Sequence, residues 1–414
     1  MPADMTVSLS APLSVPSRIT RGSRAWRSTG LALFLSGFSS FALIYCVQPL
    51  LPAFATGFGL TPAAASLALS LTTGMLALSI VALGALSQQL GRKGLMTASM
   101  LAAAALNLGA ALVPGWQGLL AMRALEGLAL GGVPAVAMAY LAEEVAPRDL
   151  GKAMGLYISG TAFGAMMGRV GMGLLLDWTD WRMAMAGLGG ACLLAALGFI
   201  LLLPPSRHFT RARAAGPGFH LAAWGRHLRD RRLLRLYALG FCLTSIFVTV
   251  FNYATFRLSA APYGLSATQV SLIFLAFGFG VVSSNVAGAL SDRIGRRPLL
   301  VLAFGLVLAG LALTLLAPIV AIFAGVALIA TGFFIGHSLA SSAVGATAAE
   351  TKGHAAALYL LFYYAGSSVV GSLGGWFWQH LGWDGVAGLA AAMALAALAL
   401  SAGVPGRAAA RSAP

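Results

Sequence analysis

One carboxylate and two guanidinium groups lie inside stretches that are otherwise apolar, where their chemistry needs an explanation. Glu126 and Arg123 belong to the apolar run at 116–141, and Arg169 belongs to the run at 153–176. A run of about 20 apolar residues can span a membrane as a helix, and residues three apart on a helix share a face. At about 1.5 Å per residue, Glu126 is expected roughly 15 Å from one end of its helix, near the middle of a bilayer.

An ionised side chain at the centre of a bilayer costs about 2.5–3.5 kcal/mol on insertion scales, so each of the three needs a partner or a cavity. Three interpretations are open. In the first, Arg123 and Glu126 pair at rest, and a proton on Glu126 or an arriving substrate releases Arg123. In the second, Arg123 and Arg169 bind an anionic group of the substrate. In the third, the ion pair is static or Arg169 extends toward the outer membrane surface.

The composition indicates which elements position these residues. Of 414 residues, 59% are apolar and 9% are charged, against about 45–50% and about 25% in soluble domains, which argues against a soluble enzyme. Twelve apolar runs lie at 31–51, 63–86, 95–113, 116–141, 153–176, 183–203, 234–258, 270–290, 299–316, 319–347, 355–377 and 385–404. The sequence therefore predicts an all-α, polytopic membrane protein with twelve transmembrane helices, embedded in a lipid bilayer.

The net charge of +15 comes from 26 Lys and Arg against 11 Asp and Glu, a balance that in a soluble chain would indicate nucleic-acid binding. In membrane proteins, however, Lys and Arg concentrate in cytoplasmic connections. With a cytoplasmic N-terminus, 22 of the 26 fall on that side. The charge thus predicts topology, with both termini cytoplasmic, and no nucleic-acid partner. The histidines show no metal-ligand spacing, so no metal or cofactor is expected.

An internal repeat relates the two halves of the chain. The segment 84–94, GALSQQLGRKG, matches the segment 288–298, GALSDRIGRRP, at 6 of 11 positions and an offset of 204. A second set of matches, at an offset of 202, pairs Tyr157 with Tyr359 and Trp181 with Trp383. Six crossings separate the copies, so both keep the same membrane orientation, as in parallel repeats about an axis along the membrane normal.

The first copy of the repeated loop contains groups that could hold one end of the protein together. Gly84 permits the close approach of a neighbouring helix, and Gly91 permits a turn with unusual dihedral angles. Arg92 and Lys93 could meet phosphates, helix ends or the carboxylates at 143–144. They could also serve only the positive-inside topology.

These features resemble the major facilitator superfamily of secondary transporters, over nearly the whole chain from about residue 31 to residue 404. The segment 84–93 is similar to the family's signature between helices 2 and 3, although Gln88 replaces its Asp. Arg123 with Gly127 resembles the R-x-x-x-G signature of helix 4. The segments 45–52 and 157–169 look closest to the YnfM-like, arabinose-efflux-type branch of proton-coupled exporters.

The glycines of the fifth run have two explanations. The spacing of Gly155, Gly164 and Gly168 resembles the start of a signature that the family's drug antiporters carry in helix 5, although Arg169 replaces its Pro. Alternatively, small residues at four-residue spacing let two helices pack closely, and Gly160 extends that stripe.

The resemblance implies two sets of functional residues. In the family, the loops between helices 2 and 3 and between helices 8 and 9 hold a cytoplasmic gate. This implies gate roles for Gly84, Gln88, Gly91, Arg92, Lys93, Glu143 and Glu144, and in the second copy for Gly288, Asp292, Arg293, Gly295 and Arg296. Helices that line the family's central cavity carry Tyr45, Gln48, Tyr157, Asn252, Tyr253, His337, Tyr359 and Tyr363. Each of these could equally be an ordinary packing group.

The resemblance further implies a transporter, not an enzyme, that exports a small organic molecule such as a drug, sugar or metabolite in exchange for protons. Arg123, Glu126 and Arg169 would couple the two, and the proton gradient would supply the energy. Uptake or facilitated diffusion by the same fold is the alternative, and a membrane-embedded enzyme or receptor is a remote one. We expect a monomer in the bacterial inner membrane.

The expected organisation has five parts. They are a flexible cytoplasmic tail at 1–28, a six-helix bundle at 29–203, a basic cytoplasmic linker at 204–233, a second six-helix bundle at 234–405 and a tail at 406–414.

Overall fold

The computed structural model describes residues 18–209, 216–348 and 351–404, with the side chains at 85–86, 88–90 and 217 left out. In these ranges the regular elements are helices, apart from one bridge pair between Ile19 and Val145. The helices are α1 (Arg24–Tyr45), η1 (Gln48–Leu50), α2 (Leu51–Phe58), α3 (Pro62–Leu90), α4 (Arg92–Leu112), α5 (Trp116–Leu130), α6 (Gly132–Glu144), α7 (Leu150–Trp178), α8 (Trp181–Leu202), α9 (Pro217–Arg229), α10 (Arg231–Ser259), α11 (Ala267–Ser271), η2 (Leu272–Ala276), α12 (Phe277–Ile294), α13 (Arg296–Thr314), α14 (Ile319–Thr347) and α15 (Lys352–Ser401).

Twelve of the described helical segments cross the molecule, several of them assembled from more than one element. Ten are long and apolar enough to span a membrane by length and composition. One of the ten, α15, is divided by Gly382, whose φ of 59° is not helical, and so provides two crossings. The remaining crossing is α7, which packs along α1. The prediction of an all-α protein with twelve transmembrane helices is confirmed.

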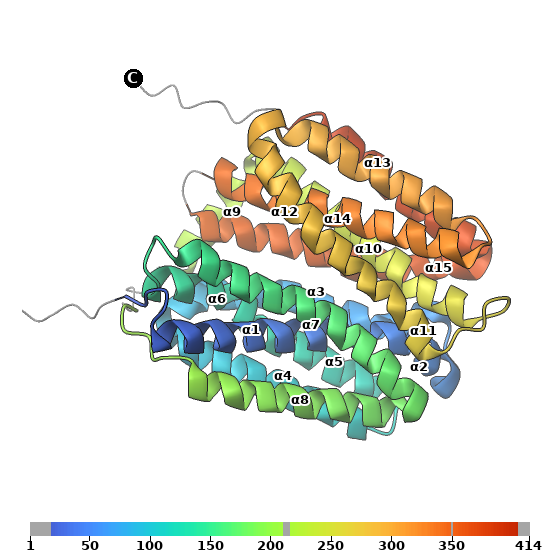
Figure 1. Ribbon diagram of the computed structural model, residues 1–414, viewed down its shortest axis with the longest axis horizontal. Helices are drawn as coiled ribbons and strands as arrows, with labels where there is room; N and C mark the ends of the chain where they lie inside the picture. The colour runs from blue at the N-terminus through green and yellow to red at the C-terminus, as the bar shows by residue number, and fades with distance from the viewer. Residues whose placement is uncertain (1–17, 210–215, 349–350, 405–414) are drawn as a thin grey trace, which may run out of the picture.

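The helices form two bundles (Figure 1). In the first, α1 to α8 pack mainly on one another, and in the second α10 and α12 to α15 do so, while the short α11 packs mainly on α7. We call the face of the molecule that carries α9 and the described chain ends the linker face. The turns that carry α2 and α11 lie at the other end of the bundles, which we call the opposite face (Figure 1).

The two bundles meet mainly through α3 against α15 and α7 against α11. The hydroxyl of Ser372 donates to that of Ser70 at 2.7 Å. The carboxylate of Asp177 accepts the N–H groups of Ala267 and Thr268 at 3.0 Å, across the start of α11. Such hydrogen bonds lie between the middle of the bundles and the opposite face, and none joins the bundles near the linker face in the described part of the chain. The molecule is therefore closed at the opposite face.

The first helix starts earlier and breaks sooner than its apolar run suggests. It begins at Arg24, inside the stretch that the sequence assigned to a tail, because the Ser23 hydroxyl accepts the N–H of Trp26 at 3.1 Å and caps the helix. It ends at Tyr45, four residues before Pro49. Proline lacks an N–H and clashes with the carbonyl four residues earlier, so this break follows from the sequence.

A stripe of glycines holds α7 against α1. A Cβ built at Gly160, Gly164 or Gly168 would lie 2.2–2.6 Å from a backbone atom of α1, which leaves no room for a side chain. Of the two explanations for these glycines, the structure supports close packing. The packing also fixes the height of Arg169, the next residue along α7, against the broken end of α1.

Candidate functional site

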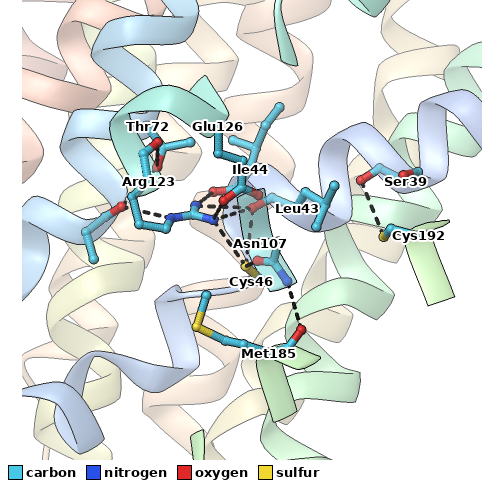
Figure 2. Close-up of polar contacts among 11 residues, drawn as sticks. Ser39, Leu43, Ile44, Cys46, Thr72, Asn107, Arg123, Glu126, Met185 and Cys192 are labelled. Atoms are coloured by element: carbon cyan, nitrogen blue, oxygen red, sulfur yellow. Dashed lines mark hydrogen bonds and ion pairs between the residues drawn. The ribbon is translucent and has the colours of Figure 1, made fainter. Parts of the chain in front are cut away.

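Arg123 on α5 binds the broken end of α1 (Figure 2). Its Nη2 donates to the carbonyls of Leu43 and Ile44 at 3.2 and 3.0 Å, and its Nη1 also reaches Leu43 at 3.2 Å. These carbonyls belong to the last turn of α1, where helix carbonyls lose their internal donors. A cation there also meets the negative end of the helix dipole. Arg123 therefore compensates a helix end that would otherwise be left unsatisfied inside the bundle.

Glu126 neutralises this arginine. Its Oε2 lies 2.6 Å from Nη1 of Arg123, and both side chains are completely buried. The third guanidinium nitrogen, Nε, donates to the carbonyl of Ala68 on α3 at 3.3 Å. All three nitrogens of Arg123 are thus engaged within one bundle, which argues against Arg123 as a direct ligand for a substrate. The other oxygen of Glu126, Oε1, is buried and has no hydrogen-bond partner among the described residues.

Arg169 on α7 lies on the other side of the same break. Its guanidinium carbon is 4.1 Å from the ring centroid of Tyr45, and 5.1 and 4.9 Å from those of Phe274 and Phe277 in the second bundle. Its Nε donates to Oε1 of Gln48. The side chain is 1% exposed, so it does not extend toward the membrane surface, as one of the open interpretations would have it. The aromatic rings at the bundle interface hold it inside.

The charge of Arg169 has no acidic partner in the described part of the chain. Its Nη1 donates to the carbonyl of Ala165, one turn earlier on α7. Its Nη2 is buried and makes no hydrogen bond to a described residue. The ion pairs among the described residues do not include Arg169. The two buried arginines therefore differ in charge balance, since the carboxylate of Glu126 serves only Arg123.

Gln48 joins Arg169 to the second bundle. Its Nε2 donates to Oδ1 of Asn252 on α10 at 2.7 Å. Gln48 and Asn252 are 204 residues apart, which is the offset of the internal repeat, so equivalent positions of the two halves meet at the pseudo-symmetry axis. Tyr253, the next residue, does not line a cavity: it is fully buried, and its hydroxyl donates to the carbonyl of Gly371 on α15 at 2.9 Å.

A cluster of aromatic side chains in the second bundle, on α14 and α15, lies beside Tyr45 of the first. The ring of His337 on α14 stacks against Phe333, and its Nδ1 lies 2.9 Å from the hydroxyl of Tyr359 on α15. The ring of Tyr363 is 4.8 Å from that of His337, and its hydroxyl faces that of Tyr45. His337 and Tyr363 are half-buried, while Tyr359 is buried. These side chains extend the site around Arg169 toward the second bundle.

Tyr157 on α7 and Tyr364 on α15 are both buried, and Tyr157 packs in the core of the first bundle. The ring of Tyr364 meets that of Tyr363 edge to face at 5.1 Å. Of the eight residues expected to line a cavity, Gln48 and Asn252 meet across the bundles, Tyr45 contacts Arg169, and His337, Tyr359 and Tyr363 cluster in the second bundle. Tyr157 and Tyr253 pack inside the first and the second bundle, respectively. A role in lining a cavity stays a prediction for the first six.

The first copy of the repeated loop contains an ionic latch, the ion pair of Arg92 and Glu143, within its own bundle. The guanidinium of Arg92, at the start of α4, lies 2.6 Å from Oε1 of Glu143 at the end of α6, and also donates to the hydroxyl of Ser87. Lys93 donates to the carbonyls of Ile200 and Leu203 at the end of α8, where a cation is favoured. The loop thus ties three helix ends of the first bundle together.

The neighbouring Glu144 has a different partner from the one expected. It accepts the backbone N–H of His208 at 2.8 Å, and its Oε2 lies 2.9 Å from Nδ1 of the same residue. The carboxylate therefore holds residues 204–209 against the first bundle rather than binding Arg92 or Lys93.

The second copy of the loop shares the backbone but lacks the latch. Gly91 and Gly295 both have positive φ, 83° and 87°, which glycine adopts without strain. In the second copy, Asp292 and Arg293 are exposed, and neither forms an ion pair with a described residue. Nε of Arg296 is buried without a described partner. The copy that retains the family's Asp is therefore the one without an ion pair in this conformation.

Gly84 does not have the expected contact. A Cβ built there, or at its counterpart Gly288, would meet no described atom within 4 Å. The close helix approach predicted for Gly84 is therefore wrong for this conformation. The side chain of Gln88 lies outside the described residues, so its contribution to the latch stays a prediction.

Sequence reasoning missed the groups that complete the two arginine sites. For Arg123 they are backbone carbonyls of α1, and the dipeptide Gln48-Pro49 was the signal, because a proline inside a helix frees carbonyls. For Arg169 they are Phe274 and Phe277, which lie about 100 residues away in a run of other apolar residues and carry no local signal.

Comparisons with known proteins agree with this architecture. A family model described as Major Facilitator Superfamily matches residues 33–370 and 259–413. The chain is 45% identical over 383 residues to the uncharacterized MFS-type transporter YybF of Bacillus subtilis (strain 168), covering 92% of this chain and 95% of YybF. It is 44% identical over 387 residues to the inner membrane transport protein YnfM of Escherichia coli (strain K12), covering 93% of each.

A solved structure shows the same fold at low identity. The nucleoside transporter NupG aligns with a TM-score of 0.72 and 16% identity, over 90% of this chain and 99% of NupG. The matched family model and the two relatives show more than fold. This chain belongs to the major facilitator superfamily, and it is a multi-pass membrane protein that acts as a secondary transporter rather than an enzyme.

Proposed function

We propose that the protein exports a small organic molecule, such as a drug, sugar or metabolite, across the bacterial inner membrane in exchange for protons. It would act as a monomer with both termini in the cytoplasm. One observation carries the proposal: an unbroken series of contacts leads from the buried acid Glu126, through Arg123 and the broken end of α1, to Arg169 at the bundle interface.

Glu126 is the proposed proton site. It is fully buried, and its Oε1 accepts no hydrogen bond from a described residue, so a proton can bind there without breaking one. A proton on this carboxylate removes the negative charge that faces Arg123. The remaining partners of Arg123 are then mainly the carbonyls of Leu43 and Ile44, so the proton changes how strongly the end of α1 is held.

The end of α1 would pass this change to the substrate site. Tyr45 and Gln48 lie one and four residues after Ile44, whose carbonyl Arg123 binds. Tyr45 lies under the guanidinium of Arg169, and Gln48 binds both Arg169 and Asn252 of the second bundle. A displacement of this short segment therefore alters the substrate site and the contact between the bundles together.

Alternating access would follow from breaking and remaking contacts at the two faces. Opening of the opposite face requires the hydrogen bonds of Gln48 with Asn252 and of Ser70 with Ser372 to break. If the linker face is cytoplasmic, as the positions of Lys and Arg favour, this conformation is closed toward the outside. The loop with Arg92 and Glu143 and its second copy would then form the cytoplasmic gate.

Inverted membrane vesicles from producing cells test this proposal. Respiration acidifies their lumen, and a pH-sensitive dye reports the gradient after addition of a panel of charged and neutral drugs, sugars and metabolites. An exporter that exchanges substrate for protons should collapse part of the gradient with some of the compounds, only in vesicles that contain the protein. A symporter or a facilitator gives no such collapse from this side, and that result would overturn the proposed antiport.

A matched variant assigns the proton site. Glu126→Gln keeps the size and hydrogen bonding of the side chain but cannot ionise. We expect it to abolish the compound-dependent collapse of the gradient while leaving exchange of substrate for substrate. An undiminished collapse would show that another group carries the proton.

A further inference from the structure

We propose that the site around Arg169 takes a small organic anion, with a carboxylate on the guanidinium and an apolar or aromatic body against the neighbouring rings. This inference rests on the proposed function, because it names the substrate class of the same site.

The first argument is the charge balance. Arg169 is a buried cation with no acidic partner in the described part of the chain, whereas buried charges in proteins are normally paired. Glu126, the acid at comparable depth, already serves Arg123 at 2.6 Å. The site around Arg169 therefore carries an excess positive charge, which an anionic substrate would neutralise and a cationic one would increase.

The second argument is the position of the unused donors. Nε and Nη1 of Arg169 already donate to Gln48 and to Ala165, and only Nη2 is unpartnered among the described residues. Hydrogen bonds between a guanidinium and a carboxylate are about twice as strong as neutral ones. With one nitrogen available, the arginine would bind one carboxylate oxygen. The phenol of Tyr45, whose ring centroid lies 4.1 Å from the guanidinium carbon, and that of Tyr363 next to it would donate to the other oxygen.

The third argument is the surrounding surface. The guanidinium is flanked by the rings of Tyr45 on α1, Phe274 in η2 and Phe277 on α12. His337 and Tyr363, both half-buried, continue the aromatic surface into the second bundle. Aromatic rings favour other rings in offset or edge-to-face contact. The surface is thus suited to a ring or an alkyl chain, and poorly suited to a sugar, whose many hydroxyls would lack partners.

Binding of matched acids and amides to the purified, full-length protein tests the inference without requiring transport. The pairs are benzoate with benzamide, phenylacetate with phenylacetamide, and 3-phenylpropionate with 3-phenylpropanamide, measured by calorimetry at neutral pH. Each pair has nearly the same shape and differs in charge. We expect at least one acid to bind ten-fold or more tightly than its amide. If no acid is preferred over its amide, the anion proposal is wrong.

Variants then place the site. Arg169→Gln should bind the acid and its amide with about the same affinity. Arg169→Lys, which keeps the charge, should still prefer the acid, but less strongly than the parent protein does. Arg148→Gln, which removes an exposed arginine, is the matched control and should bind like the parent protein. A preference that survives Arg169→Gln would overturn the assignment. If Arg169→Gln does not yield folded protein, the comparison of acids with amides on the parent protein and on Arg169→Lys tests the assignment instead. An Arg169→Lys variant that binds the acid more tightly than the parent protein would contradict the assignment.

The binding experiments and the transport experiment can give different answers, so the anion site and the proton-coupled export can fail independently. A preference for acids without any compound-dependent proton flux would support the anion site and overturn proton-coupled export. Proton flux driven only by neutral or cationic compounds, without a preference for acids, would support the export and overturn the anion site.

Discussion

Arg123 and Arg169 occupy the two sides of one break in helix α1, and they differ in what balances their charge. Arg123 binds the carbonyls that precede the break, and Glu126 neutralises it. Arg169 contacts Tyr45 and Gln48 at and after the break, with aromatic rings and amide or carbonyl oxygens in place of an acid. Two buried arginines beside the same few residues thus serve different purposes. The carboxylate of Glu126 lies next to Arg123, which makes Arg123 the neutralised arginine and leaves the charge of Arg169 unbalanced.

The two sites also differ in their relation to the bundles. The partners of Arg123 lie on α1, α3 and α5, all in the first bundle. Arg169 is held by α1 and α7 of the first bundle and by η2 and α12 of the second. A rigid-body movement between bundles would leave the first site intact and take the second apart. The first is suited to holding the fold and a proton, and the second to sensing a substrate.

Removal of Arg123 is expected to have the largest effect on stability. Arg123→Leu leaves the charge of Glu126 buried without a partner and the carbonyls of Leu43 and Ile44 without donors. Breaking one side of a buried ion pair typically costs about 3–5 kcal/mol. We expect a loss of that size in the free energy of unfolding, measured by titration of mixed micelles with sodium dodecyl sulfate.

The double variant Arg123→Leu/Glu126→Leu is the control. Because it removes both charges, it should recover much of the loss of the single variant. A double variant that is as unstable as Arg123→Leu would show that the carbonyls of α1, rather than the carboxylate, are what requires the arginine.

Neutralising Glu126 alone should have a smaller effect. In Glu126→Gln, Arg123 keeps its carbonyl partners and still donates to the amide oxygen. The loss of the opposite charge should therefore cost no more than about 1.5–3 kcal/mol, the worth of a hydrogen bond to a charged group. The same titration measures this loss. A larger loss than that of Arg123→Leu would reverse the comparison, because the acid would then be the structural member of the pair.

Removal of Arg169 should change stability least among the charged residues of the site. Arg169→Leu gives up cation–π contacts worth about 0.5–2 kcal/mol but also removes a buried charge that no acid balances, and burial of such a charge is unfavourable. We expect the free energy of unfolding to change by less than about 1 kcal/mol, with loss of substrate binding. A loss comparable to that of Arg123→Leu would show that Arg169 is structural too.

Much of the fold could be predicted from the sequence, because membrane helices are specified by apolar length and by the positions of Lys and Arg. The same rules cannot locate breaks inside a run. Pro49 ends α1 at Tyr45, before the run at 31–51 ends. The break at Gly382, by contrast, falls between the runs at 355–377 and 385–404, where the sequence places it. The start of α1 at Arg24 depends on the Ser23 cap, to which hydropathy is insensitive.

The site could be predicted in part for an equally physical reason. Arg123 and Glu126 are three residues apart on one helix, so their contact follows from helix geometry. The partners of Arg169 come from the other half of the chain, and they are phenylalanines in a run full of apolar residues. Tyr253 shows the converse, because a tyrosine on a cavity helix can also face its neighbour, and only the structure tells which.

The last expected effect is on conformation rather than on stability, and it concerns the closure that separates the two sites from the opposite face. Asp177 caps the first turn of α11 across the bundle boundary, and loss of a helix cap typically costs about 0.5–2 kcal/mol. Asp177→Ala should therefore shift the equilibrium toward opening of this face with little loss of fold. The measurement is the rate at which a maleimide labels a cysteine introduced by Ser372→Cys, which faces Ser70 in the closed contact. Asp180→Ala, which removes the cap of α8 within one bundle, is the control and should leave the labelling rate unchanged. If both variants accelerate labelling equally, the effect is general loosening, and the cap of α11 has no special part in closing the transporter.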